Sequence, residues 1–211
     1  MKRLFFIFVI MYAIVGCVKV QSNVESYSSL DNTALGASVF VAPTKGQATN
    51  TLSWSKNKSL LEQELKSSGL NVVSSPKRAD YLAYFGFAVD AGQLVTTNYS
   101  IPQYGVTGYS GANTYGSVYG NSYSSTTTLN PTYGVTGYSS GSRTDKIFTR
   151  SAKLFLQDRK SKEIVFEGNA VSSGSCHSFA PVAPYIIKSI LTNFPDGKVG
   201  RVVLDTEDFE C

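Results

Sequence analysis

The chain has 211 residues, of which 42% are hydrophobic and 16% are charged. This length predicts one domain that is large enough to bury a core. The formal net charge is +4, and no run of Lys or Arg concentrates it. Because nucleic-acid binding and polybasic membrane patches both need clustered positive charge, this composition argues against both, and we expect no nucleic-acid partner.

The first 17 residues have the features of an export signal that ends in a lipid attachment site. Lys2 and Arg3 form a basic start, and residues 4–15 form an apolar run that is short for a membrane-spanning helix but suits a signal peptide. The Ile-Val-Gly-Cys stretch that ends at Cys17 resembles the lipobox of bacterial lipoproteins. That resemblance implies a signal peptide over residues 1–16, diacylglycerol on Cys17, and durable anchoring by more than one acyl chain such as palmitate. The alternative is an uncleaved signal anchor.

The segment after the signal, residues 17–36, is expected to hold the lipidated cysteine and a polar tether. Residues 18–32 contain four serines and few apolar positions, which is typical of a linker. Val18 stands where an Asp would typically retain a lipoprotein at the inner membrane. We therefore expect a cell-envelope protein that is held on the outer membrane and faces the periplasm.

Two further cysteines, Cys176 and Cys211, are expected to form a disulfide bond. Outside the cytoplasm disulfides persist, and Cys17 is assigned to the lipid. A bond that closes this loop would stabilise the fold by roughly 3 to 4 kcal/mol. The alternative is two free thiols. With His177 as the only histidine, no zinc cluster and no other cofactor is expected.

The folded domain is expected to begin at residue 37 and to continue as one unit, 37–211. Residues 38–42 are β-branched or aromatic and stop at a proline, which predicts a buried strand. Residues 51–68 have leucines on one side and stop at a glycine, which predicts an amphipathic helix. Residues 79–89 are apolar enough to form a central strand of a sheet.

The composition changes abruptly at residues 91–142. These 52 residues contain no charged side chain, eight of the 13 tyrosines and nine of the 18 glycines. We expect a long hairpin or loop insertion in the domain. Tyr, Ser, Gly and Asn are typical of binding loops, and the absence of charge suits a neutral partner, a glycan or another envelope protein. The candidate binding residues are Tyr104, Tyr109, Tyr115, Tyr119, Tyr133 and Tyr138.

The seven-residue sequence YGVTGYS occurs twice in this segment, at residues 104–110 and 133–139. Because its first six letters read nearly the same in both directions, the two copies could pair as antiparallel strands. If partner numbers summed to 242, Tyr104 would face Tyr138, and such cross-strand aromatic pairs stabilise a sheet. The alternative to this pairing is a flexible insertion whose repeat is a relic of a duplication, since glycine weakens strands. The alternative to a binding role is a solvated loop with no partner.

The remaining elements follow the insertion. Residues 146–157 and 163–170 indicate two strands joined by a polar turn, which predicts a hairpin with Asp158 as a turn residue. Residues 184–193 predict an amphipathic helix with a proline in its first turn. Residues 199–204 predict a last strand.

Several of these stretches resemble the bacterial lipoproteins of the DUF4136 family, an envelope family without an assigned activity. The resemblance lies in KRADYLAYFGFAV at residues 77–89, the Tyr/Gly-rich insertion, LFLQDRKSKEIVFEGNA at 154–170 and IIKSILTNFPDG at 186–197. It covers residues 38–197. It implies an α+β fold in which a mostly antiparallel sheet carries two helices packed on one face.

The sequence offers little support for catalysis. GYSSG at residues 137–141 fits the G-x-S-x-G pattern around Ser139, but the strand, turn and helix that this motif needs are not indicated. His177 stands beside Cys176, which suggests a catalytic pair of thiol and imidazole. Neighbouring side chains of an extended chain point to opposite faces, however, so this adjacency argues against contact between the two groups. We therefore expect a non-catalytic binding or structural module and no enzyme. The alternative is an envelope hydrolase that uses two carboxylates in a cleft.

Overall fold

The computed structural model describes residues 19–31 and 34–206, and most of these residues lie in strands. The chain divides into two compact units. The first, the sheet unit, contains the chain up to Gln93 and from Lys146 onward, and the second, the ribbon, is Leu94–Asp145. In the part of the chain that the structure describes, no helix has the length and apolar composition needed to cross a membrane.

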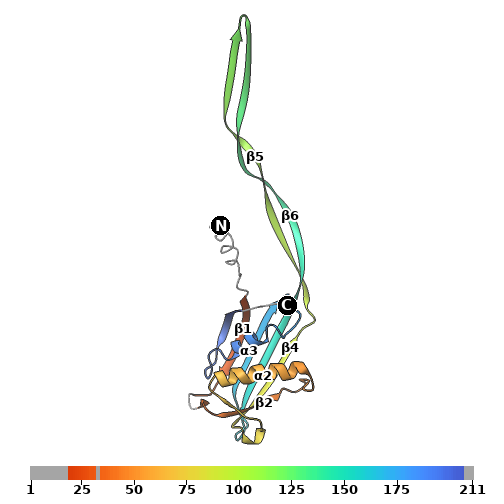
Figure 1. Cartoon of the computed structure of the whole chain (residues 1–211), viewed down its shortest axis with the longest axis vertical. Helices are drawn as coiled ribbons and strands as arrows, with labels where there is room; N and C mark the ends of the chain where they lie inside the picture. Colours follow the sequence, from red (N-terminus) through yellow and green to blue (C-terminus); the bar gives the residue numbers. More distant parts are fainter. Residues whose placement is uncertain (1–18, 32–33, 207–211) are drawn as a thin grey trace, which may run out of the picture. The chain divides into compact units, whose positions relative to one another are not determined.

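The sheet unit is an open mixed sheet with two described helices (Figure 1). The strands of the chain are β1 (Lys19–Ser28), β2 (Ser38–Pro43), β3 (Asn71–Val72), β4 (Tyr81–Val89), β5 (Gln93–Tyr119), β6 (Ser122–Asp158), β7 (Ile164–Gly174) and β8 (Val199–Asp205). They pair in the order β3-β2-β4-β6-β7-β1-β8, and β5 pairs with β6 off this path. β2 is parallel to β3 and β4, whereas β4 with β6, β6 with β7, β7 with β1, and β1 with β8 are antiparallel.

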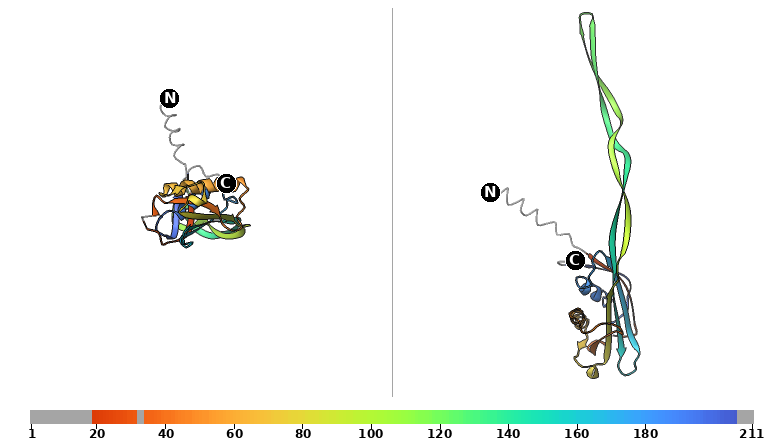
Figure 2. Two further views of the ribbon diagram at one scale, coloured as in Figure 1. Left: turned by 90° about the horizontal axis from the view of Figure 1, so that it is seen from below. Right: turned by 90° about the vertical axis from the view of Figure 1, so that its right-hand side faces the viewer.

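The two helices, α2 (Leu52–Ser67) and α3 (Ala183–Ile190), contact each other and cover one face of the sheet (Figures 1 and 2). The Thr51 hydroxyl accepts a hydrogen bond from the Trp54 N–H at 3.1 Å and so caps α2, and a proline in the first turn begins α3. A short 3₁₀ turn, η2 (Pro76–Arg78), precedes β4. Both predicted helices are confirmed, although α3 ends earlier, at Ile190.

The core fills the space between these helices and the sheet. Phe85 of β4, Leu154 of β6 and Phe166 of β7 are fully buried, and they pack in one cluster with apolar side chains of both helices. Gly168 of β7 lets α3 approach closely, because a Cβ there would lie 2.5 Å from Cγ2 of Ile190. Burial of this apolar face is the main source of stability in the sheet unit.

Residues 19–28 correct the expected tether. They form β1, which pairs with β7 on one side and β8 on the other, so the folded chain begins well before residue 37. Side chains of β1 alternate strictly between buried and exposed, as in a strand with one face on a core. Two of the four buried positions are serines, Ser22 and Ser26, which gave the segment its polar composition. The buried hydroxyl of Ser26 has a hydrogen-bond partner, because the backbone N–H of Lys198 donates to Ser26 Oγ at 2.8 Å.

Two aspartates near strand ends have structural roles. In the turn between β6 and β7, Asp158 accepts hydrogen bonds from the N–H groups of Lys160 and Ser161, which confirms the predicted turn residue. Hydrogen bonds from the Ser161 and Lys160 amides hold the pKa of Asp158 below its ordinary value. Asp80 joins the starts of β2 and β4, and hydrogen bonds from the Ser38 hydroxyl and amide lower its pKa.

Candidate functional site

The ribbon consists of β5 and β6 up to Asp145, joined by a two-residue loop at Gly120 and Asn121. Gly120 has a φ of 60°, the left-handed conformation that tight hairpin loops favour. No residue from 94 to 145 is buried. The ribbon therefore has no core of its own, and its side chains are available to solvent or to a partner.

All six candidate tyrosines lie on the ribbon and are exposed. Their exposed fractions range from 60% for Tyr109 to 93% for Tyr119. The other four, with fractions between these values, are Tyr104, Tyr115, Tyr133 and Tyr138. An array of exposed aromatic side chains on paired strands is a candidate interaction surface.

Two further tyrosines cover glycines of the opposite strand. A Cβ placed on Gly141 would lie 2.7 Å from the Tyr99 ring, and one on Gly116 would lie 2.5 Å from the Tyr123 hydroxyl. Aromatic rings that lie across strand glycines shield backbone that would otherwise be bare. Tyr99 and Tyr123 were not among the candidates, because their contacts with Gly141 and Gly116 depend on the register of the two strands, which the sequence did not predict.

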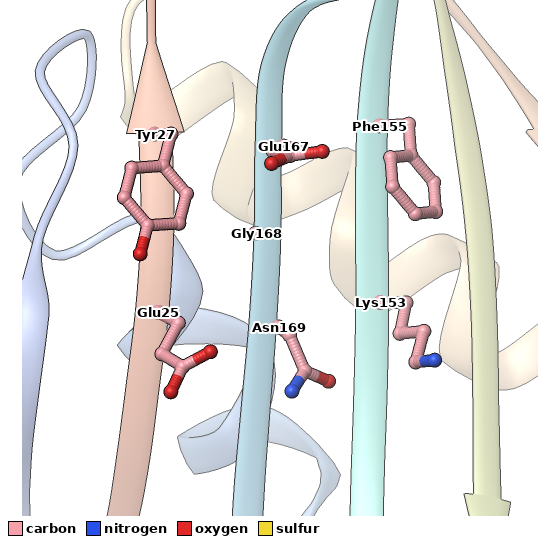
Figure 3. A pocket seen from close by; sticks show the side chains of 7 residues that line it. All are labelled: Glu25, Tyr27, Lys153, Phe155, Glu167, Gly168 and Asn169. Carbon is pink, nitrogen blue, oxygen red and sulfur yellow. The ribbon is translucent and has the colours of Figure 1, made fainter.

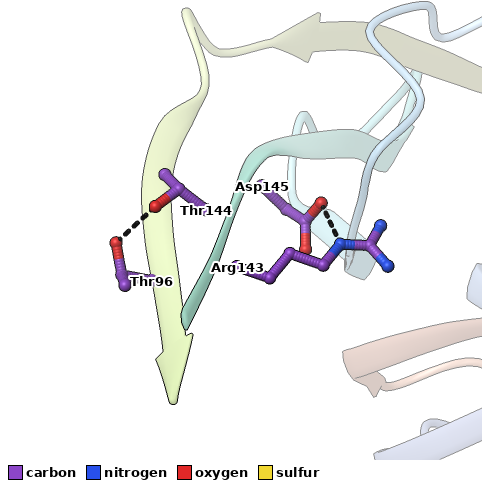
Figure 4. A network of polar contacts seen from close by, with 4 residues as sticks. All are labelled: Thr96, Arg143, Thr144 and Asp145. Carbon is purple, nitrogen blue, oxygen red and sulfur yellow. Dashed lines mark hydrogen bonds and ion pairs between the residues drawn. The ribbon is translucent and has the colours of Figure 1, made fainter. Parts of the chain in front are cut away.

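Polar contacts between the strands are made mainly by threonines and serines. Thr96 and Thr144 hydroxyls lie 2.8 Å apart across the ribbon, and Thr114 and Thr127 hydroxyls lie 2.9 Å apart nearer the loop. Figure 4 shows the first pair beside the ribbon's only two charged residues, in which Arg143 Nε donates to Asp145 Oδ1 at 2.9 Å. The surface of the ribbon is therefore close to neutral.

The register of the ribbon differs from the expected one by one residue. A Cβ on Gly105 would lie 3.0 Å from Cγ2 of Thr136, and these residue numbers sum to 241 instead of 242. The two-residue loop at Gly120 sets this register, because the residues on either side of it have the same sum. A shift of one residue moves side chains to the other face, so the expected pair of Tyr104 and Tyr138 is wrong.

A second candidate site is a hollow on the sheet face opposite the helices. It has a volume of about 210 Å³. Figure 3 shows its side chains in front of three neighbouring strands, with helices behind the sheet. The lining residues are Glu25 and Tyr27 of β1, Glu167, Gly168 and Asn169 of β7, and Lys153 and Phe155 of β6.

Strand register assembles this hollow from two cross-strand rows. Glu25 is the partner of Asn169, which is in turn the partner of Lys153. In the next row Tyr27, Glu167 and Phe155 follow one another across the same strands. Oδ1 of Asn169 is buried and has no hydrogen-bond partner among the described residues. The hollow thus offers two carboxylates, an ammonium, a free acceptor and two aromatic rings to a small polar molecule.

The sequence alone did not indicate this hollow. Glu25 and Tyr27 lie in the segment whose composition predicts a tether, and no local pattern links them to residues 153–169. Residues 19–28 do alternate with a period of two, which is the pattern of a strand. The alternation can be recognised only if serine is accepted at buried positions.

The remaining predicted site residues are only partly within the described chain. Cys17 and Cys211 lie outside the described residues, so lipidation and the bond to Cys176 stay predictions. Cys176 is 2% exposed, in the loop between β7 and α3. Ser139 lies inside β6 and not at a strand-to-helix turn, so GYSSG does not form a nucleophile elbow. His177 contacts Phe148 edge to face, with ring centres 6.2 Å apart.

No metal site is visible in residues 19–31 and 34–206, where no three His, Cys, Asp or Glu side chains are grouped to hold an ion.

This protein is a small module of strands and helices in which strands predominate. One unit is an open mixed sheet with two helices on one face, and the other is a ribbon of two strands. The chain belongs to the family of domains of unknown function DUF4136, whose sequence pattern matches residues 20–196. The predicted DUF4136 family is confirmed, and the match also includes most of β1, whereas the lipoprotein character stays a prediction.

Several solved structures match this chain at low sequence identity. A PDZ domain protein from Parabacteroides distasonis has 12% identity and a TM-score of 0.47, and the match covers 92% of this chain but only 40% of that one. Two structures of the PelC dodecamer from Paraburkholderia phytofirmans have 14% and 12% identity and TM-scores of 0.39 and 0.40. Each of these matches covers 81% of this chain and 95% of PelC. No curated protein matches this chain.

Proposed function

We propose that this chain is a lipid-anchored protein of the bacterial cell envelope that binds a neutral partner through its ribbon and catalyses no reaction. The observation that carries the proposal is the exposure of six tyrosines on a unit without a core. Large exposed aromatic groups are unfavourable in water unless a partner covers them, so such arrays mark interaction surfaces.

The chemistry of the ribbon favours an uncharged partner, a glycan or a neutral protein surface. Tyrosine rings give flat, rigid contact area, and the many hydroxyls of Ser and Thr give adaptable hydrogen bonds. Arg143 and Asp145, the only charged residues of the ribbon, bind each other. The deciding measurement is capture of an envelope component by the parent chain and by a chain that lacks residues 103–142.

The lipid anchor belongs to the same proposal and makes a prediction of its own. We expect mass spectrometry of the mature protein to find an amino terminus at Cys17 that carries diacylglycerol and an acyl chain. Because β1 begins at Lys19, about two residues or 7 Å from Cys17, the anchor would hold the sheet unit close to the membrane surface. Cys17→Ser should move the protein from the membrane to the soluble fraction. An intact Met1, or an unmodified Cys17, would contradict the anchor.

The hollow of Figure 3 favours an envelope hydrolase as the second candidate, because it places Glu25 and Glu167 on neighbouring strands. Two carboxylates at one cleft are the usual equipment for acid and base catalysis on glycosides. If the hollow is catalytic, the parent should release reducing ends from envelope glycans, and Glu167→Gln should lower that rate at least 100-fold, the scale of a lost acid or base. Equal and negligible rates in both proteins would leave the non-catalytic proposal standing.

A further inference from the structure

The sheet face opposite the helices carries charges that are separated across neighbouring strands. In one cross-strand row, Glu25 of β1 is the partner of Asn169 of β7, and Asn169 is the partner of Lys153 of β6. Gly86 of β4 continues this row beyond Lys153. The row therefore has a carboxylate at its β1 end and an ammonium toward its β4 end.

The negative end of the row has hydrogen-bond acceptors that lack donors. Oδ1 of Asn169 is buried and has no partner among the described residues. In Figure 3 the Glu25 carboxylate extends toward Asn169, with Glu167 in the neighbouring row. Neither glutamate forms an ion pair in the described part of the chain. A primary ammonium has three N–H donors and so can satisfy these acceptors together, while the rings of Tyr27 and Phe155 favour a cation beside them.

The positive end of the row has donors without an acid. Figure 3 shows the ammonium of Lys153 on the side away from Asn169, and Lys153 makes no ion pair within residues 19–31 and 34–206. It lines a second hollow, of about 750 Å³, with Thr44 and Lys45 of the loop after β2, and no described acidic residue lines this hollow. A Cβ on Gly86 would collide with the Thr44 hydroxyl, so this hydroxyl takes the place of a side chain in the row. Ammonium and hydroxyl groups are donors to an anion.

The spacing of the strands sets the distance between the two ends. Neighbouring strands lie about 5 Å apart, so a ligand that crosses from β7 to β6 meets acceptors and then donors within about this length. We propose that this face binds a small zwitterion, an amino acid or short peptide. Its ammonium lies between Glu25 and Asn169, and its carboxylate accepts from Lys153. The proposal is independent of the partner of the ribbon and of the lipid on Cys17, and it requires binding without turnover.

Isothermal titration calorimetry of the full chain with three probes of equal carbon number tests this site. The probes are γ-aminobutyrate, with one ammonium and one carboxylate, putrescine, with two ammonium groups, and succinate, with two carboxylates. The parent should bind γ-aminobutyrate at least about 10-fold more tightly than the other two, because only the zwitterion satisfies both ends of the row. Absence of γ-aminobutyrate binding would overturn the proposal. So would equal affinity for putrescine or succinate, because one charge alone would then account for binding.

Variants at the two ends assign the contacts. Glu25→Gln and Lys153→Met should each weaken γ-aminobutyrate binding about 10-fold or more, whereas Lys153→Met should not weaken putrescine binding, because it removes a like charge. Both side chains are exposed, so Tm should stay unchanged. Glu163→Gln, at an exposed glutamate outside the hollow, removes the same charge as Glu25→Gln and should leave the affinity unchanged. Parental affinity in Glu25→Gln or in Lys153→Met would refute the assigned site.

Discussion

Val24→Asp is expected to unfold the sheet unit, whereas Asn23→Asp beside it is expected to be tolerated. Val24 is 1% exposed in β1, where it lies between Ala170 of β7 and Gly200 of β8. A carboxylate at this position has no described cation to pair with, and an uncompensated buried charge typically lowers the free energy of unfolding by about 3 to 5 kcal/mol. That is a large fraction of the stability of a small domain.

Urea unfolding followed by far-ultraviolet circular dichroism measures the difference. Asn23 faces solvent on the same strand, so Asn23→Asp controls for the added charge and should change the free energy of unfolding by no more than about 0.5 kcal/mol. Similar unfolding curves for Val24→Asp and the parent would mean that residues 19–28 behave as a tether after all. They would also mean that β7 and β8 do not depend on β1.

Removal of residues 103–142, with the flanks joined by a short turn, is expected to abolish partner binding while the sheet unit stays folded. The ribbon forms a compact unit separate from the sheet unit, and none of its residues is buried. Changes in loop length act on stability mainly through closure entropy, which is weak, so the free energy of unfolding should change by no more than about 1 to 2 kcal/mol.

The experiment needs both a folding and a binding measurement. Thermal unfolding establishes that the shortened chain is folded, and capture from an envelope extract then compares it with the parent. A matched control keeps the ribbon and replaces the exposed Leu129 by Ser, which leaves all eight ribbon tyrosines in place. A shortened chain that fails to fold would show that the ribbon is needed by the core, and a shortened chain that binds as well as the parent would move the site to the sheet unit.

The elements with a strong local signal were predictable from the sequence. Residues 81–89 form β4 because their apolar and aromatic side chains suit a buried strand, and residues 52–67 form α2 because Thr51 caps a helix with one apolar side. The family was recognisable for the same reason, since its motifs coincide with these elements. In the ribbon, composition and repeat indicated exposed tyrosines and strand pairing.

The register and the sites depended on the tertiary structure. A two-residue loop and not the repeat set the pairing of the ribbon, because loop length fixes register in a hairpin. β1 was missed because Ser22 and Ser26 occupy inward positions, where partners from distant segments make a hydroxyl acceptable.

The hollow and the row of charges across it are decided by contacts between distant segments. Glu25 and Glu167 become neighbours only when β1 inserts between β7 and β8, and Lys153 joins them only because β6 pairs with β7. The sequence by itself determined the chain's local elements, its family and the neutral, tyrosine-rich character of the ribbon. Only the tertiary structure decided which side chains share a site, because pairing between strands more than a hundred residues apart is set by packing of the whole sheet and not by any local pattern.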